Sequence, residues 1–152
     1  LYSPSEHGRG SWVAMTFDDR GRMLTSDQYG FLYRLELPPL GADTAARPRI
    51  EKLNLPAPDT ARLVSSGRGA DSTASRVGMG YAQGLLWAFN SLYVMVNHKS
   101  DTNFVRGSGL YRLQDTNGDD QLDQITLLKS FKGEGEHGPH SIVLSPDGQS
   151  LY

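Results

Sequence analysis

Oxygen-bearing side chains recur at alternate positions of residues 115–123, which read DTNGDDQLD. Hard cations such as Ca²⁺ take about six to eight oxygen ligands, and a tight loop turns alternate side chains toward one centre. The predicted ligands are the side chains at loop positions one, three, five and nine, with one backbone carbonyl at position seven: Asp115, Asn117, Asp119, Asp123 and Gln121. This spacing favours a structural calcium site, and the alternative is an acidic surface turn that binds no metal.

The calcium loop is expected on a β-hairpin and not between two helices. Gly118 permits the sharp turn that a wrapped loop needs. A helical EF-hand would place Glu at the twelfth loop position, where this chain has Thr126. The flanking residues 109–113 and 124–128 are apolar and β-branched without a helical period, which is typical of strands.

A second concentration of reactive side chains lies in residues 133–140, which read GEGEHGPH. Histidine can accept a proton from an alcohol or an aldehyde hydrate near neutral pH. Three interpretations stay open: His137 is a general base or substrate contact, His137 and His140 bind a transition metal, or a histidine hydrogen-bonds within a turn. The other two histidines, His7 and His98, lie in polar loops and are expected at the surface.

Composition limits the class of protein. The chain has 152 residues, the length of one ordinary domain, and its 17 Gly and 8 Pro suit a turn-rich β fold. A net charge of −2 with scattered Lys and Arg argues against a nucleic-acid partner. The lack of Cys excludes disulfides, thiol nucleophiles and covalently attached haem c within these residues. No apolar run is long enough to span a membrane.

Three segments of the chain share a strand–turn–strand pattern, at residues 12–26, 84–96 and 141–152, with the turns expected at 18–21, 90–91 and 145–148. The first two are each followed by two further strand-like runs, 30–35 and 50–55 in one case, 109–113 and 124–128 in the other. Four short antiparallel strands that repeat in this way are typical of β-propeller blades. The predicted fold is therefore all-β, a partial β-propeller of about two and a half four-stranded blades, with an open meander or sandwich as the alternative.

The predicted organisation has four parts. Residues 1–56 form the first blade, 57–80 an inter-blade insertion, 81–132 the second blade with the calcium hairpin, and 133–152 the start of a third blade. Because the chain stops at Tyr152 inside a strand-like run, we expect it to be part of a longer protein. The insertion is rich in Gly, Ser and Ala, and is either a solvated loop or a segment whose Arg76 reaches an anionic ligand.

Four motifs together resemble the propeller of exported sorbosone-dehydrogenase-like, haem-binding proteins, which carry the planctomycete-type membrane-bound dehydrogenase domain. They are GSWV at 10–13, SDQYG at 26–30, GLYRLQD at 109–115 and EHGPH at 136–140. The resemblance covers nearly the whole chain except residues 57–80. More distantly, the chain is similar to glucose and aldose dehydrogenases that use pyrroloquinoline quinone and calcium, which are six-bladed propellers.

This resemblance implies an exported or periplasmic protein that oxidises a sugar-type alcohol or aldehyde and passes the electrons to a quinone, with a cytochrome c as a further acceptor. His137 stands nine residues before Pro146, the position of the base that deprotonates the sugar hydroxyl in those enzymes. Pro139 and His140 replace a glycine pair of that motif. His140 and Arg76 are the candidate contacts to the quinone, and haem c would belong to a further module.

The resemblance also implies that most quinone contacts would lie beyond Tyr152, so we expect these residues alone to have no dehydrogenase activity. The competing hypothesis is a non-catalytic propeller that binds a glycan or a protein partner through the same face.

Overall fold

A computed structural model describes residues 2–28, 30–43, 45–56, 78–98, 106–133 and 135–152. Within these residues the chain is all-β, and the helical content is limited to two short 3₁₀ turns, η1 (Ser5–His7) and η2 (Gly135–His137). The all-β prediction is therefore confirmed. No helix in the described ranges has the length and apolar character that crossing a bilayer requires. Arg76 lies outside the described residues.

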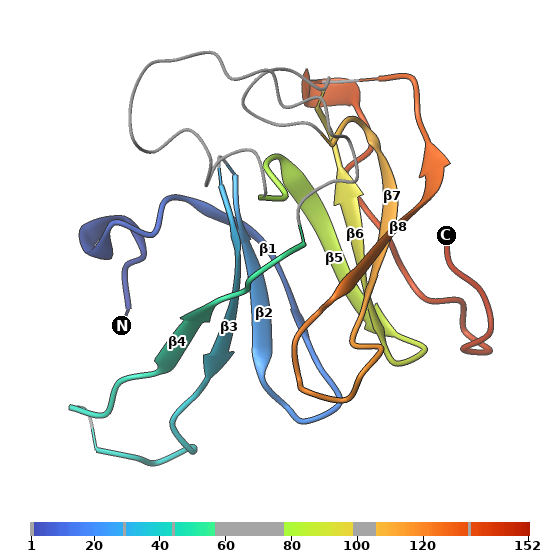
Figure 1. Ribbon diagram of the computed structural model, residues 1–152. Coiled ribbons are helices and arrows are strands. Elements are labelled where there is room, and N and C mark those ends of the chain that lie inside the picture. The colour runs from blue at the N-terminus through green and yellow to red at the C-terminus, as the bar shows by residue number, and fades with distance from the viewer. Residues whose placement is uncertain (1, 29, 44, 57–77, 99–105, 134) are drawn as a thin grey trace.

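Two four-stranded antiparallel sheets follow one another along the chain (Figure 1). The first sheet contains β1 (Trp12–Phe17), β2 (Met23–Asp27), β3 (Leu32–Glu36) and β4 (Arg49–Lys52). The second contains β5 (Ala82–Ala88), β6 (Ser91–Val96), β7 (Gly109–Gln114) and β8 (Gln124–Ser130). In each sheet every strand pairs with the next strand in sequence, so both are simple meanders. The expected pair of four-stranded antiparallel units is present.

The two sheets also share a β-bulge in their first strand. The register of β1 against β2 shifts between Trp12 and Ala14, and that of β5 against β6 shifts between Ala82 and Gly84. A shift of this kind is a β-bulge, in which an extra residue locally bends and twists the strand. Both sheets therefore bend at the second residue of their first strand.

The turn between β1 and β2 has the same construction as the turn of the C-terminal hairpin. Asp18 Oδ1 accepts the backbone N–H groups of Arg20 and Arg22, at 3.0 and 2.8 Å. In the C-terminal hairpin Ser145 Oγ accepts those of Gln149 and Ser150, at 3.1 and 2.8 Å. A short polar side chain at the first turn position thus holds both turns closed.

The turn between β5 and β6 differs from the prediction by one residue. Phe89 and Asn90 occupy its two central positions with φ angles of 49° and 52°, whereas Asn90–Ser91 was predicted. Two consecutive left-handed residues make a hairpin turn whose twist matches that of the strands. Ser91 consequently belongs to β6.

The C-terminal hairpin is less regular than predicted. The expected strands at 141–144 and 149–152 reduce to one bridge between Leu144 and Leu151, next to a reciprocal pair of backbone hydrogen bonds between Val143 and Tyr152. A two-stranded hairpin without a further strand is only marginally stable, which explains the short ladder.

The second sheet lies between the first sheet and the C-terminal hairpin. Side chains from both sheets share the main core, which includes Leu24, Leu32, Leu85 and Leu92. On the other face of the second sheet, Ile142 of the hairpin packs with a smaller buried cluster, made of Ala88, Tyr93 and Met95. Burial of this apolar surface is the main force that holds the three layers together.

The outer face of the first sheet is equivalent to a face of the second sheet that is buried. Met15 and Phe17 lie two and four residues after the bulge of β1, and Leu85 and Trp87 lie at the same positions after the bulge of β5. Leu85 is 8% exposed where it packs toward the first sheet, but Met15 is 65% and Phe17 50% exposed. The apolar face of β1 is therefore exposed to solvent, whereas the equivalent face of β5 is covered by the first sheet.

Candidate functional site

The predicted calcium loop connects β7 to β8, so it lies on a hairpin as expected. Two of its residues adopt left-handed backbone conformations, Gly118 with a φ of 80° and Asp120 with a φ of 68°. EF-hand loops place an invariant Gly at their sixth position, and Asp120 occupies that position here. Asparagine, aspartate and glycine tolerate this conformation best, so the loop can turn sharply twice.

Backbone N–H groups engage the predicted ligand side chains. The two carboxylate oxygens of Asp115 accept from Gly118 at 2.7 Å and from Asp120 at 2.8 Å. Asn117 Oδ1 accepts from the backbone of Asp119, and Asp119 Oδ1 from that of Gln121, both at 2.9 Å. These bonds fold the loop around its own side chains.

Asp123 closes the loop from the other side. Its carboxylate accepts the hydroxyl of Thr116 at 2.7 Å and the backbone N–H of the same residue at 2.8 Å. These bonds lower the pKa of Asp123, the hydroxyl bond having the larger effect. A carboxylate that is ionised over a wide pH range is a suitable ligand for a hard cation.

The donor chemistry of the loop fits Ca²⁺, since five of its residues offer oxygen and each carboxylate oxygen keeps a lone pair beside its hydrogen bond. In the described ranges, however, no three His, Asp or Glu side chains converge closely enough to hold a metal ion. Binding would therefore have to draw Asp115, Asp119 and Asp123 toward a common centre.

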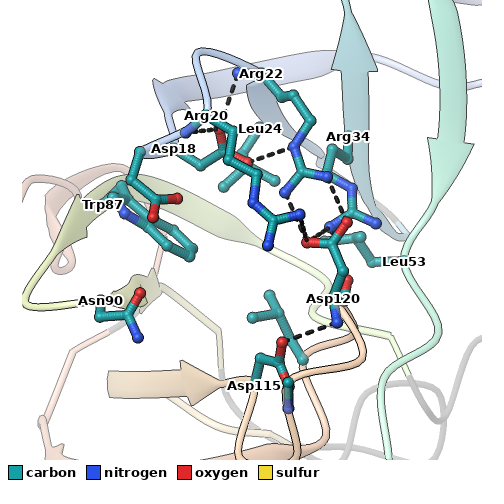
Figure 2. A pocket seen from close by; sticks show the side chains of 13 residues that line it. Asp18, Arg20, Arg22, Leu24, Arg34, Leu53, Trp87, Asn90, Asp115 and Asp120 are labelled. Carbon is teal, nitrogen blue, oxygen red and sulfur yellow. Dashed lines mark hydrogen bonds and ion pairs between the residues drawn. The ribbon is translucent and has the colours of Figure 1, made fainter.

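Asp120, which the sequence analysis did not select, reaches from this loop to the first sheet (Figure 2). Its carboxylate accepts two hydrogen bonds from the guanidinium of Arg22, at 2.5 and 2.8 Å. Its backbone carbonyl accepts a third bond from Arg34 Nη1 at 2.8 Å. Bidentate guanidinium–carboxylate pairs are among the stronger polar interactions in proteins. The hairpin loop of one sheet is thereby anchored to the β1–β2 turn and to β3 of the other.

The charges around Asp120 reinforce one another. Hydrogen bonding to Arg22 lowers the pKa of Asp120 to about 2, and the same contact raises the pKa of Arg22. Arg34 also binds Glu51 on β4 at 2.8 Å. Burial tends to raise the pKa of Glu51, but hydrogen bonding and the charge of Arg34 outweigh burial, and the pKa is lowered. Asp120 thus belongs to a network that stays charged at neutral pH.

This network borders a cavity of about 240 Å³ between the turns at one end of the two sheets. Its polar lining includes Arg20 and Asn90, and Trp87 supplies an aromatic wall opposite Asp120 (Figure 2). The arginines are already paired with carboxylates, so the arrangement serves to join the sheets.

A larger cavity, of about 510 Å³, lies at the opposite end of the sheets. It is bordered by amide, imidazole and phenol side chains and one glycine: Gln28, Gln83, Asn97, His98, His140, Tyr81 and Gly135. The rings of Tyr81 and His98 stack with centroids 4.0 Å apart at an angle of 13°. Flat rings beside amide groups suit a ligand with apolar faces and a polar rim, such as a sugar.

Asn97 joins two parts of this cavity. Its side-chain amide donates to the carbonyl of Gly135 at 2.6 Å and lies 3.2 Å from His140 Nε2. The residue is 5% exposed. A Cβ atom on Gly138 would lie 1.8 Å from Asn97 Oδ1, so glycine is required where the histidine loop crosses this side chain. The loop that the sequence singled out is therefore built onto the end of β6.

The two predicted histidines are placed differently. Both are exposed, but His140 borders the cavity, whereas His137, in η2, is not among the described lining residues. His98 was expected at the surface but is half-buried against Tyr81. No spacing in the sequence pairs Tyr81 with His98, because their contact depends on the register of β5 with β6.

The described residues that line the larger cavity include no Lys or Arg. A tricarboxylate quinone needs cationic partners, so this part of the lining does not by itself fit pyrroloquinoline quinone. A neutral hydroxylated molecule fits its chemistry better. Arg76, the predicted cationic contact, lies outside the described residues.

No protein-family model, curated protein or solved structure matches this chain. Its resemblance to the sorbosone-dehydrogenase-like proteins therefore stays a prediction from the motifs.

Proposed function

We propose that the two sheets are consecutive blades of a β-propeller and that the C-terminal hairpin begins a third. The shared bulge and the equivalent apolar faces of β1 and β5 support this arrangement. A blade buries its faces only against neighbouring blades. In a closed ring, another blade would cover Met15 and Phe17 as the first sheet covers Leu85 and Trp87.

Within this propeller, the larger cavity binds a sugar-type alcohol or aldehyde. The observation that carries this proposal is the polar lining around the Asn97–His140 contact, whose described residues include no Lys, Arg, Asp or Glu, beside the stacked rings of Tyr81 and His98. Its volume of about 510 Å³ lies in the usual range of small-molecule sites, roughly 300–1,000 Å³.

In the whole protein, the bound molecule would be oxidised, as the motif resemblance implies. His137 is the candidate base that accepts the hydroxyl proton, and it stands three residues before His140, which borders the site. We assign no electron-transfer step, because the described lining does not provide the cations that the quinone requires. An exported location and a cytochrome c acceptor belong to the same proposal.

Two observations favour a second candidate, a propeller that binds glycans without oxidising them: His137 is exposed, and the described residues of the lining include no Lys, Arg, Asp or Glu. Binding and turnover separate the two. In the intact protein, calorimetric titration with monosaccharides should show binding that Gln83→Ala weakens at least fivefold and that Asn90→Ala, at the opposite end, leaves unchanged.

If sugar binds but no electrons reach added quinone and an artificial acceptor, the glycan-binding function is supported. If turnover occurs, His137→Ala should lower kcat, and an unchanged kcat would remove His137 from the proposed role. Absence of sugar binding, or binding that Gln83→Ala leaves unaltered, would refute the proposed site.

The loop 115–123 would bind Ca²⁺ as a structural ion through the side chains of Asp115, Asn117, Asp119 and Asp123 and the carbonyl of Gln121. When bound, the ion would hold these oxygens together and stiffen the β7–β8 hairpin. This role is separate from the sugar cavity, since the loop lies at the other end of the strands.

A further inference from the structure

We propose that Asn97 is a positioning residue that fixes His140 in the neutral tautomer with its proton on Nδ1. Its Nε2 would then act neither as a base nor as a metal ligand. The tautomer itself does not depend on the proposed sugar site, while its consequence for the reaction does.

The orientation of the Asn97 amide follows from its shorter contact. A backbone carbonyl can only accept, so the atom 2.6 Å from the Gly135 oxygen must be the amide nitrogen. The reverse orientation would place two acceptor oxygens against each other. The amide N–H₂ group has two hydrogens, and only one of them is used by Gly135.

The same nitrogen lies 3.2 Å from His140 Nε2. Because an amide nitrogen cannot accept a hydrogen bond, Nε2 must present its lone pair to it. The proton of the neutral ring therefore resides on Nδ1. The chain of donors and acceptors runs from the Gly135 carbonyl through Asn97 to His140.

Packing keeps this arrangement from reversing. Asn97 is 5% exposed, and its backbone N–H donates to the carbonyl of Tyr81 at 2.9 Å, which extends the pairing of β5 with β6. Its Oδ1 is buried against Gly138 and has no hydrogen-bond partner among the described residues. A buried polar atom without a partner is tolerated only where the surrounding contacts are strong.

The hydrogen bond from Asn97 removes the Nε2 atom of His140 as a base. Proton removal at the proposed sugar site is therefore assigned to another group. The metal interpretation of His137 with His140 loses Nε2 as a ligand, since the Asn97 amide already occupies its lone pair.

The test is the ¹⁵N spectrum of the histidine side chains in the intact protein, recorded above neutral pH with long-range correlation to the ring protons. His140 should show an acceptor-type Nε2 and a protonated Nδ1. In Asn97→Asp the carboxylate can only accept, so His140 should carry a proton on Nε2. Asn90→Asp, a control at the other end of the sheets, should leave the His140 signals unchanged.

A wild-type His140 with its proton on Nε2 would overturn the inference, as would an Asn97→Asp spectrum identical to the wild type. The wild-type spectrum decides the matter alone if the variant does not fold. Failure to bind any sugar, with the expected tautomer present, would refute the proposed function and leave this inference standing.

Discussion

The carboxylate of Asp120 accepts two hydrogen bonds from the guanidinium of Arg22, at 2.5 and 2.8 Å, and these bonds cross from the second sheet to the first. Asp120 comes from the loop proposed to bind calcium, and Arg22 from the turn that leads into β2. The contact therefore links the conformation of that loop to the way the two sheets pack.

Removing the charge of Asp120 should destabilise the protein. Asp120→Asn leaves the guanidinium of Arg22 without its bidentate partner, and hydrogen bonds to charged groups typically contribute about 1.5–3 kcal/mol. We expect a loss of about 2 kcal/mol in the free energy of unfolding, measured by urea denaturation. Asp119→Asn, which alters an exposed neighbour, should cost less than half as much at low calcium, and equal losses would contradict the anchoring role.

Acid should weaken the same contact. The pKa of Asp120 is lowered from 3.8 to about 2 in the folded protein, so the folded state holds this proton more weakly than the unfolded state does. The contribution of the Asp120 carboxylate to the free energy of unfolding is fully present above about pH 4 and is lost as the pH falls toward 2. Urea midpoints measured from pH 5 to pH 2 should fall less steeply in Asp120→Asn than in the wild type. Parallel curves would show that the ion pair does not form.

Calcium should raise the melting temperature through the 115–123 loop. Asp115→Asn keeps one side-chain acceptor for the backbone N–H bonds but removes a negative ligand. We expect a melting temperature close to that of the wild type with chelator, and a much smaller rise when calcium is added. Asp19→Asn, in the β1–β2 turn, serves as the control and should respond to calcium like the wild type. Equal calcium-induced shifts in all three proteins would argue against a bound ion at this loop.

A methyl group on Gly84 should loosen the C-terminal hairpin. Its Cβ would lie 2.6 Å from the backbone carbonyl oxygen of His140, which is too close for any real contact. Gly84→Ala should therefore destabilise the protein by about 1–3 kcal/mol, the usual cost of overpacking. It should also displace the histidine loop, and nuclear magnetic resonance would detect this as shifts of His140 larger than those of His7. Unperturbed His140 signals would mean that the hairpin does not pack against β5.

Local patterns predicted the strands well but not the contacts between sheets. The apolar run at 12–17 coincides with β1, because an apolar run and the turn that follows it at 18–21 are both local signals. The β5–β6 turn was placed one residue late, since Phe is not a residue that usually signals a left-handed conformation. Asp120 stood in the selected loop, yet its partner Arg22 is 98 residues away, and only the packing of the sheets brings them together.

In the candidate site, too, local sequence signals identified some residues but not those placed by strand pairing. His140 was selected because a Gly-rich loop concentrates histidines, which is visible in sequence. Asn97 and Tyr81 carry no such signal, because their places at the cavity depend on the bulged register of β5 with β6. The exposed apolar face formed by Met15 and Phe17 could likewise be recognised only by comparing the strand registers of the two sheets.

The most direct test of the propeller proposal is the accessibility of Met15 in the intact protein. The chain has no Cys, so single cysteines can be introduced at chosen positions, with any others in the protein replaced. Under native conditions, a thiol reagent should label Leu40→Cys rapidly, since Leu40 is fully exposed, and label Met15→Cys as slowly as Leu85→Cys. Labelling of Met15→Cys as fast as Leu40→Cys would show that no blade covers this face and would contradict the account.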